Sequence, residues 1–484
     1  MTKVIIAVFD GLQPAQIDSS VCPNIHQLSQ DGCFFESHHP VFPSVTRINA
    51  ASMVTGVNPG SHGLPGNTFV ARDFDPGRVL SAMEPELAAI ASSGLPVLYT
   101  PTLQEILSTV GLEYMSIGVG TSGNAYAHNP RGEEFGGATI HPDFSIPSSL
   151  HANLLSSFGE WPAESIPNTD RYVHAMDIFL DFVLEEKNPD VALIWSSEPD
   201  KSQHAFGVGS PESCAALAQA DAQFGRLLGY LEASPNHKKA DVLVLSDHGY
   251  STIIGAVDIE GEMKRAGFHV GPGPEGVLVA SNGGSALIYV GEANRDLADR
   301  IVSWLISNEW CGAILASERL GHIEGTIPAS VISYDGPRCP DITVSFKWTS
   351  EMNVERFAGH VYSTGGAPGL GQHGSMSRHE MNNTLLCRGP SFRKGERILS
   401  PSGNIDVMPT VLDLLGVTVP ESIDGRVLEE AFSDFEGEIV SETREYVATR
   451  KTEKHTYEQS IVVSRVDKSI YLDEGNSSVR ITKI

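Results

Sequence analysis

The sequence has little positive charge. It carries 33 Lys and Arg residues against 60 Asp and Glu residues, a formal net charge of −27. No run of Lys or Arg stands out, and a field of this sign repels DNA, RNA and anionic membranes. We therefore expect neither a nucleic-acid polymer nor a membrane as a partner. An anionic substrate is still compatible with this charge where metal ions reverse the local potential.

Long hydrophobic runs and paired cysteines are also lacking. No window of about 18 uninterrupted apolar residues occurs, so we expect no membrane-spanning helix. The chain enters an apolar run at Val4 without the features of a signal peptide. The 6 cysteines are scattered without CxxC spacing, which argues against a zinc–thiolate site and for reduced thiols. Together these absences predict a cytoplasmic protein.

What the sequence does contain is a series of short, continuous apolar runs of strand length: residues 4–9, 114–119, 191–195 and 241–246. Continuous rather than alternating apolar residues indicate strands that are buried on both faces, as in a parallel sheet between two layers of helices. Segments 170–187 and 211–233 carry apolar residues three and four apart, which predicts crossover helices. The predicted fold class is α/β.

The composition changes after residue 252. Glycine- and proline-rich turns surround an expected strand at 285–291, a helix at 293–308 and a strand at 312–317, which read as a compact β-α-β unit. The resulting division is a core formed by residues 1–255 and 369–435, an inserted α+β cap subdomain at 256–368, and a C-terminal β-rich extension at 436–484 packed on the core.

Residues of the types that bind metals follow three of the predicted strands, and another lies in a later glycine-rich loop. These residues are Asp10, Asp200, His204, Asp247, His248 and His373. The carboxyl ends of parallel strands meet at one edge of a sheet, where ligands bind. Each residue alone also fits a turn, a helix cap or a hydrogen-bonded pair. As a set they supply oxygen and nitrogen ligands for two divalent ions that share one phosphate.

Thr46 lies in VFPSVTRINAASMVTG (41–56), between a Phe-Pro turn and the expected first turn of a helix. A threonine in this position often caps the helix through its side-chain oxygen. Metal coordination activates such a hydroxyl as a nucleophile, and a helix N-terminus favours a phosphoryl group. The residues alone leave both roles open.

Several motifs occur in the order of a known family: FDG (9–11), FPSVTRINAASMVTGVNPGSHGLPGN (42–67), EPDKSQHAFG (198–207), SDHG (246–249) and QHG (372–374). This set resembles the alkaline phosphatase superfamily and, within it, the type I phosphodiesterase and nucleotide pyrophosphatase family together with phosphonoacetate hydrolase. The resemblance implies an alkaline-phosphatase-like sandwich, with a central, mostly parallel sheet flanked by helices and a small inserted α+β cap subdomain.

The resemblance also implies a cofactor of two Zn²⁺ ions, with Mn²⁺ as the alternative. One ion would be held by Asp10, Thr46, Asp247 and His248, and the other by Asp200, His204 and His373. Thr46 would form the covalent phosphoryl-enzyme intermediate. Asn67 would bind a phosphoryl oxygen, although an ordinary turn residue is the alternative.

The sequence departs from the family at positions that bear on the substrate. Arg47 stands where nucleotide pyrophosphatases commonly carry an aromatic residue of the nucleotide pocket. It could grip a phosphate or carboxylate bidentately, or form a salt bridge at the helix start. The lysines with which phosphonoacetate hydrolase binds carboxylate are absent from residues 118–133, and no sulfatase signature surrounds Thr46. His38 and His39 are interpreted as a solvated pair outside the site.

The residues and the resemblance together imply a two-zinc phosphohydrolase with a threonine nucleophile. It would act as a phosphodiesterase or nucleotide pyrophosphatase on a small phosphorylated or phosphonate substrate. The alternatives are hydrolysis of a C–P bond as in phosphonoacetate hydrolase, phosphomonoester hydrolysis, and phosphoryl transfer as in cofactor-independent phosphoglycerate mutase. Those mutases use serine and manganese, so Thr46 argues against them. A non-catalytic metal-binding protein is the alternative outside enzymes. The sequence gives no indication of the oligomeric state.

Overall fold

A computed structural model describes residues 2–452 and 455–481. Its largest element is a nine-stranded sheet with the order β21-β2-β20-β10-β1-β9-β6-β7-β8. The four predicted strands are its centre: β1 (Val4–Phe9), β6 (Tyr114–Gly118), β9 (Val191–Ser196) and β10 (Asp241–Leu245). They are parallel neighbours and buried along their whole length, which confirms the α/β fold class.

Antiparallel strands complete the sheet toward both edges. On one side β20 (Leu385–Arg388) runs antiparallel to β10 and to β2 (Cys33–Phe35), and β21 (Glu396–Ile398) forms the edge. On the other side β7 (Ala138–His141) is parallel to β6 and pairs antiparallel with β8 (Phe144–Ile146). The sheet is therefore mostly parallel with antiparallel margins.

Helices cover both faces of this sheet, because alternate residues of each strand point to opposite sides. Ile5 and Phe9 of β1 pack in a core with α1 (Pro23–Asp31), α9 (Thr169–Ile178) and α11 (Pro211–Ala233). Ile6 and Val8 face the opposite core with α2 (Thr46–Thr55), α5 (Leu103–Ser108) and α14 (Val407–Leu414). The helix predicted at 211–233 is α11, and the one predicted at 170–187 is α9 continued by a π-helical segment over Phe179–Lys187.

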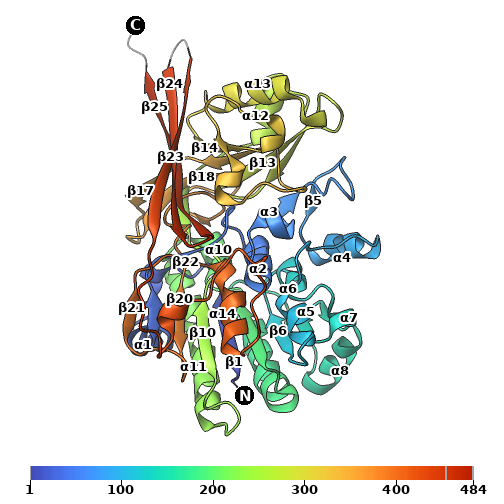
Figure 1. Cartoon of the computed structure of the whole chain (residues 1–484), viewed down its shortest axis with the longest axis vertical. Coiled ribbons are helices and arrows are strands. Elements are labelled where there is room, and N and C mark those ends of the chain that lie inside the picture. Colours follow the sequence, from blue (N-terminus) through green and yellow to red (C-terminus); the bar gives the residue numbers. More distant parts are fainter. Residues whose placement is uncertain (1, 453–454, 482–484) are drawn as a thin grey trace.

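Residues after 256 form a second sheet with the order β12-β13-β16-β14-β15, covered by α12 (Ile259–Arg265) and α13 (Arg295–Leu305) and lying above the central sheet in Figure 1. Its strands are β12 (Val277–Ser281), β13 (Ser285–Val290), β14 (Cys311–Ala316), β15 (Ile327–Pro328) and β16 (Ile342–Phe346). The predicted β-α-β unit is β13, α13 and β14. Its two strands are not neighbours, however, because β16 pairs antiparallel with both.

A four-stranded sheet joins the segments on either side of this insertion. It consists of β17 (Trp348–Met352), β18 (Ala358–Ser363), β11 (Ser251–Ala256) and β19 (Gly371–Gln372). Ser251 of β11 pairs with Gln372 of β19. This pairing brings the loop after His248 next to the loop that carries His373.

The C-terminal residues form an antiparallel sheet of β23 (Glu442–Lys451), β24 (His455–Val466) and β25 (Ser469–Ile481), which runs beside the other sheets in Figure 1. The Tyr457 hydroxyl donates to the Gly312 carbonyl of the second sheet, and the Tyr471 hydroxyl donates to Asp406 of the central part. The C-terminal sheet thus packs against both parts. The proposed domain boundaries stay a prediction.

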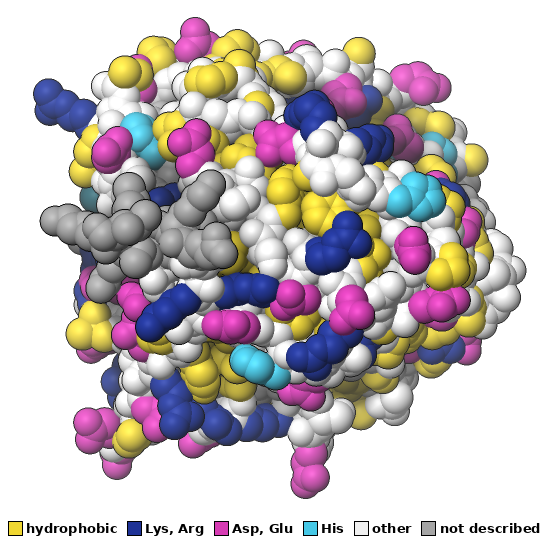
Figure 2. Space-filling view, turned by 90° about the horizontal axis from the view of Figure 1, so that it is seen from above, with side chains coloured by type: hydrophobic (Ala, Val, Ile, Leu, Met, Phe, Trp, Pro, Cys, Tyr) yellow, Lys and Arg dark blue, Asp and Glu magenta, His cyan; other side chains and the backbone are white. Residues whose placement is uncertain are grey.

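The remaining elements are short and mostly lie in connections around the central sheet. They are β3 (His38–His39), α3 (Pro59–His62), β4 (Thr68–Phe69), β5 (Leu80–Ser81), α4 (Glu84–Ser92), α6 (Ser122–His128), α7 (Gly132–Phe135), α8 (Ser149–Phe158), α10 (Asp200–Phe206) and β22 (Ser402–Gly403). Across residues 2–452 and 455–481, no helix combines the length and apolar character needed to cross a bilayer. The face seen from above carries both charge signs interspersed (Figure 2).

Candidate active site

The first group of candidate ligands lies at the carboxyl ends of β1 and β10. Asp10 directly follows β1, Asp247 lies two residues after the end of β10, and His248 comes next in the chain. The His248 Nε2 lies 3.6 Å from Asp10 Oδ1 and 3.1 Å from Asp247 Oδ2. The other ring nitrogen, Nδ1, lies 3.0 Å from the Gly249 carbonyl oxygen, to which it can only donate. The Nε2 lone pair therefore faces the two carboxylates.

Burial makes this arrangement unfavourable without a cation. Asp10 Oδ1 and Asp247 Oδ2 are buried and accept no hydrogen bond. The other oxygens are satisfied, since Trp195 Nε1 donates to Asp10 Oδ2 at 3.0 Å and the Gly11 N–H donates to Asp247 Oδ1 at 3.0 Å. Burial, together with the charges of Asp247 and Asp200, raises the pKa of Asp10 well above its ordinary value. The two unpaired oxygens would coordinate a divalent ion, whose charge would offset the repulsion between the carboxylates.

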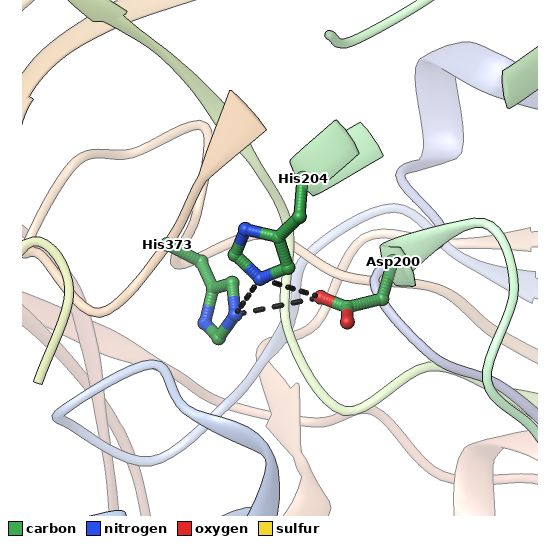
Figure 3. Close-up of side chains that lie close together, drawn as sticks. All are labelled: Asp200, His204 and His373. Carbon is green, nitrogen blue, oxygen red and sulfur yellow. Dashed lines mark hydrogen bonds and ion pairs between the residues drawn. The ribbon is translucent and has the colours of Figure 1, made fainter. Parts of the chain in front are cut away.

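The second group consists of Asp200, His204 and His373, whose side chains converge in Figure 3. The two Nε2 atoms are 3.2 Å apart, and each lies 3.4 Å from Asp200 Oδ1. His204 Nδ1 is 3.1 Å from the Gly371 carbonyl oxygen, and His373 Nδ1 is 2.7 Å from that of Ser44. In both imidazoles Nδ1 donates its proton to a carbonyl group, so in the neutral rings each Nε2 carries a lone pair. The two Nε2 lone pairs point at one another beside the Asp200 carboxylate. This is a donor set that suits a metal ion.

The two groups adjoin, and Thr46 lies against the first. The rings of His248 and His373 stack with centroids 3.6 Å apart. The Thr46 Oγ1 is 3.3 Å from His248 Nε2, and the residue is buried at 7% exposure. The structure therefore brings together all seven residues for which metal binding was predicted.

Thr46 is the first residue of α2, but it is not the N-cap. Val45 holds that position, with extended backbone angles, and its apolar side chain accepts no capping hydrogen bond. The Arg47 N–H donates to Asn67 Oδ1 at 3.1 Å, so Asn67 satisfies one of the free amides of the helix start. The hydroxyl of Thr46 is thereby left to face the metal-type residues.

Asn67 and Arg47 are linked by further contacts. The Arg47 Nη1 donates to the Asn67 carbonyl at 3.0 Å, and Nε donates to Thr121 Oγ1 at 3.2 Å. Burial lowers the pKa of Arg47 to about 10. Among the described residues Arg47 forms no ion pair, so a salt bridge does not account for its position. Since Asn67 Oδ1 already accepts a hydrogen bond, its amide nitrogen is the free donor.

Comparison with known proteins gives a family for the chain. The family model described as type I phosphodiesterase / nucleotide pyrophosphatase matches residues 4–351. The chain belongs to the type I phosphodiesterase/nucleotide pyrophosphatase family. Every predicted ligand except His373 lies within the matched residues.

Relatives within this family cover the chain to different extents. The venom phosphodiesterase of Macrovipera lebetinus is 26% identical over 255 residues, which are 52% of this chain and 26% of the venom protein. An ectonucleotide pyrophosphatase/phosphodiesterase of Caenorhabditis elegans is 22% identical over 430 residues, which are 86% of this chain and 47% of the relative. The chain thus spans about a quarter to a half of the length of these curated relatives.

A solved structure shares the fold. Murine ectonucleotide pyrophosphatase/phosphodiesterase 5, in an inactive threonine-to-alanine variant in complex with AMP, aligns with a TM-score of 0.61 at 16% identity. The alignment covers 87% of this chain and 96% of the murine chain. It supports the alkaline-phosphatase-like fold that the motifs imply.

Two residues that support the ligands were not identified from the sequence. Trp195, in β9, pairs with Val8 of β1 and donates to Asp10. The Tyr250 hydroxyl donates to Asp200 Oδ1 at 2.7 Å, although the two residues are 50 positions apart. The available signal was an aromatic residue at the end of one apolar segment, Trp195, and one shortly after another, Tyr250. Only the folded structure shows which carboxylate each of them contacts.

Proposed function

We propose that the chain is a two-metal phosphodiester hydrolase in which Thr46 attacks phosphorus. The observation that carries the proposal is the position of the histidine Nε2 atoms, whose lone pairs face one another or face Thr46. The Nε2 atoms of His204 and His373 face one another at 3.2 Å, and Thr46 Oγ1 lies 3.3 Å from the Nε2 of His248 in the adjoining group. Neutral imidazoles in these tautomers leave no proton for the contact between the His204 and His373 nitrogens, so this pair of side chains is arranged for a cation.

Asp10, Asp247 and His248, with the Thr46 hydroxyl, would hold one ion, and Asp200, His204 and His373 would hold the other. The mixture of oxygen and nitrogen donors without sulfur suits Zn²⁺, with Mn²⁺ as the alternative. Bound here, a pair of divalent ions lowers the pKa of an attacking hydroxyl and neutralises charge on the transferring phosphoryl group.

The residues of the chain then divide the reaction into two displacements. In the first, a bond forms between Thr46 Oγ1 and phosphorus while the ester P–O bond breaks, and the threonine proton ends on the departing alcohol. In the second, water attacks phosphorus, the bond to Thr46 breaks, and a water proton returns to the threonine. Asn67, which is held by its contact with the Arg47 amide, would donate from its amide nitrogen to a phosphoryl oxygen in both steps.

Replacement of the nucleophile tests this proposal. Thr46→Ala should lower kcat on bis-p-nitrophenyl phosphate by at least about 10³-fold, because the covalent route is lost. Thr46→Ser, which keeps a hydroxyl, should retain measurable turnover. A chelator should abolish wild-type activity, and added Zn²⁺ should restore it. Wild-type turnover by Thr46→Ala with an unchanged melting temperature would refute Thr46 as the nucleophile.

The same assay separates the candidate reactions. We expect bis-p-nitrophenyl phosphate to be cleaved faster than p-nitrophenyl phosphate. The reverse order would make the protein a phosphomonoesterase. Release of phosphate from phosphonoacetate, without cleavage of either ester, would indicate C–P bond hydrolysis. Stoichiometric metal binding without turnover of any of these compounds would favour a non-catalytic role.

A further inference from the structure

A pocket opens beside Thr46, Asp10 and Asp200, and its walls define the group that flanks phosphorus. Its volume is about 160 Å³, smaller than the range of about 300–1,000 Å³ usual for sites that bury drug-sized ligands. Among the described residues that line it there is no Phe, Tyr or Trp. Aromatic faces are the common platform for a nucleobase. The pocket is therefore suited to a small substituent rather than to a base.

Two cations in the pocket wall share one carboxylate. Lys201 Nζ forms an ion pair with Glu164 Oε1, and Arg171 Nη1 lies 4.0 Å from Glu164 Oε2. Arg171 is further anchored by donation from Nε to the Pro162 carbonyl at 2.8 Å. All three side chains line the pocket that contains Thr46. Within this trio, two positive charges therefore face one negative charge in the pocket that contains Thr46.

The carboxylate is the exposed member of this trio. Side-chain exposure is 58% for Glu164, against 23% for Lys201 and 15% for Arg171. Glu164 lies in residues 159–168, which form neither helix nor strand, whereas Lys201 and Arg171 lie on α10 and α9. Moving Glu164 into solvent thus disturbs no regular element, and it would free both cations.

The other titratable residues of the wall are Asp10 and Asp200, which belong to the candidate metal-binding groups, together with His141 and Asp143. The Asp143 N–H donates to His141 Nδ1 at 3.1 Å, and His141 Nε2 faces the Gly120 carbonyl at 3.1 Å. This pattern makes the imidazole neutral. Asp143 has a side-chain exposure of 67% and points its charge largely to water. Apart from Asp10 and Asp200 of the two candidate metal-binding groups, the less exposed charges of the wall are therefore those of Lys201 and Arg171.

We propose that the substrate carries a second anionic group, a carboxylate or a second phosphoryl group, which Lys201 and Arg171 bind in place of Glu164. This inference rests on the proposed function, because it takes phosphorus to lie at Thr46. Glu164 occupies the place of the substrate anion and competes with it. The exchange replaces one ion pair with another, and a guanidinium beside an ammonium can contact two oxygens of one anion.

Matched esters test the proposal, because they differ only in the flanking group. The probes are propyl, 2-carboxyethyl and 2-phosphonoethyl 4-nitrophenyl phosphate, together with thymidine 5′-(4-nitrophenyl phosphate). All of them release 4-nitrophenolate. We expect the wild type to favour a charged ester over the propyl ester by at least about tenfold in kcat/KM. The better of the two charged esters identifies the anion as carboxylate or phosphoryl.

Variants of the trio should change this selectivity in opposite directions. Lys201→Met and Arg171→Met should each reduce the ratio of kcat/KM for the charged ester to that for the propyl ester about tenfold. Glu164→Gln should raise the ratio, mainly through a lower KM for the charged ester. Lys264→Met and Glu260→Gln, which alter an exposed ion pair on α12 far along the chain, are the matched controls and should leave the ratio unchanged. The ratio is insensitive to a general loss of active protein.

A preference of the wild type for the thymidine or propyl ester, or an unchanged ratio in Lys201→Met, Arg171→Met and Glu164→Gln, would overturn the inference. Either result would leave the phosphodiesterase proposal intact, because hydrolysis itself would have been observed. Failure of the proposed function looks different: no 4-nitrophenolate is released from any ester by the metal-loaded wild type, or Thr46→Ala is as active as the wild type.

Discussion

At the scale of single residues, the site is an arrangement of buried charges that requires a partner. Asp10 and Asp247 are 3% and 0% exposed and stand at the ends of neighbouring strands. Two ionised carboxylates in such surroundings repel one another, and each leaves one oxygen without a hydrogen bond. The histidines direct their lone pairs to the same places. These features together are the reason for proposing a metal centre rather than an ordinary hydrogen-bonded cluster.

Trp195 provides a residue-scale prediction. Its indole N–H orients Asp10. Trp195→Phe should therefore lower the metal affinity of the group formed by Asp10, Asp247 and His248 by about 10–100-fold. Isothermal titration of Zn²⁺ into the metal-free protein measures this effect. Trp310→Phe is the matched control, because the Trp310 indole donates at 3.1 Å to Glu262, which belongs to neither metal group. Equal zinc affinity in Trp195→Phe and the wild type would show that this hydrogen bond does not position Asp10.

At the scale of elements, the turn after β1 places Gly11 against Asp200, one of the candidate ligands of the second ion. Gly11 has φ +69°, and a Cβ there would lie 2.7 Å from the Tyr250 ring and 3.3 Å from Asp200 Cβ. Because Tyr250 donates to Asp200, a side chain at position 11 should disturb that ligand. Glycine is therefore required both for its backbone conformation and for the close approach.

Gly11→Ala should lower the melting temperature and the zinc affinity together. The comparison is Gly94→Ala, which has φ +85° and nothing within 4 Å of the added Cβ. It isolates the backbone cost, about 1–2 kcal/mol for a non-glycine residue in the left-handed region. Differential scanning calorimetry and zinc titration of both variants provide the measurements. If both variants lose the same stability and bind zinc like the wild type, the Tyr250 ring does not exclude a side chain at position 11.

The elements also show how far the sequence could be interpreted. Continuous apolar runs predicted the four central strands, and helical periodicity predicted α11, since these signals are local. The insertion of β16 between β13 and β14 could not be predicted, because strand order depends on pairing between distant segments. The interpretation of His38 and His39 as solvated was wrong. His38 contacts Ser402 and Asn404, and His39 contacts Asp473, so both are buried by residues far along the chain.

The candidate ligands could be selected from the sequence because each follows a strand or belongs to a family motif. Their convergence in space could not be predicted from the sequence. His373 reaches the other ligands because β19 pairs with β11 across the insertion, a register that no local pattern encodes. The domain boundaries, the cytoplasmic location and the metal-binding and catalytic roles of the site residues stay predictions.

At the scale of the whole molecule, buried neutral histidines make stability depend on pH. Burial lowers the pKa values of His38, His62 and His128 to about 3, while an unfolded histidine titrates near about 6.5. Between these values the unfolded chain binds more protons than the folded one. The contribution of these histidines to the free energy of unfolding is therefore fully present above about pH 6.5, and it is lost as the pH drops toward 3.

His62 isolates one part of this effect. It accepts from the Leu64 N–H through Nδ1 and contacts Ser52 through Nε2, so protonation would remove an acceptor. By linkage it should contribute on the order of 2 kcal/mol to the loss of stability between pH 7.5 and pH 5. Urea denaturation at both pH values should show a smaller loss in His62→Gln than in the wild type. An identical loss in both proteins would contradict a neutral, buried His62.

The most direct test of the central claim is the metal content of the whole protein. After loading with Zn²⁺ and desalting, elemental analysis by mass spectrometry should give about two ions per chain for the wild type. It should give about one for Asp247→Asn paired with His248→Ala, and about one for His204→Ala paired with His373→Ala. A wild-type ratio near zero, or a ratio of two that survives both double substitutions, would contradict the account.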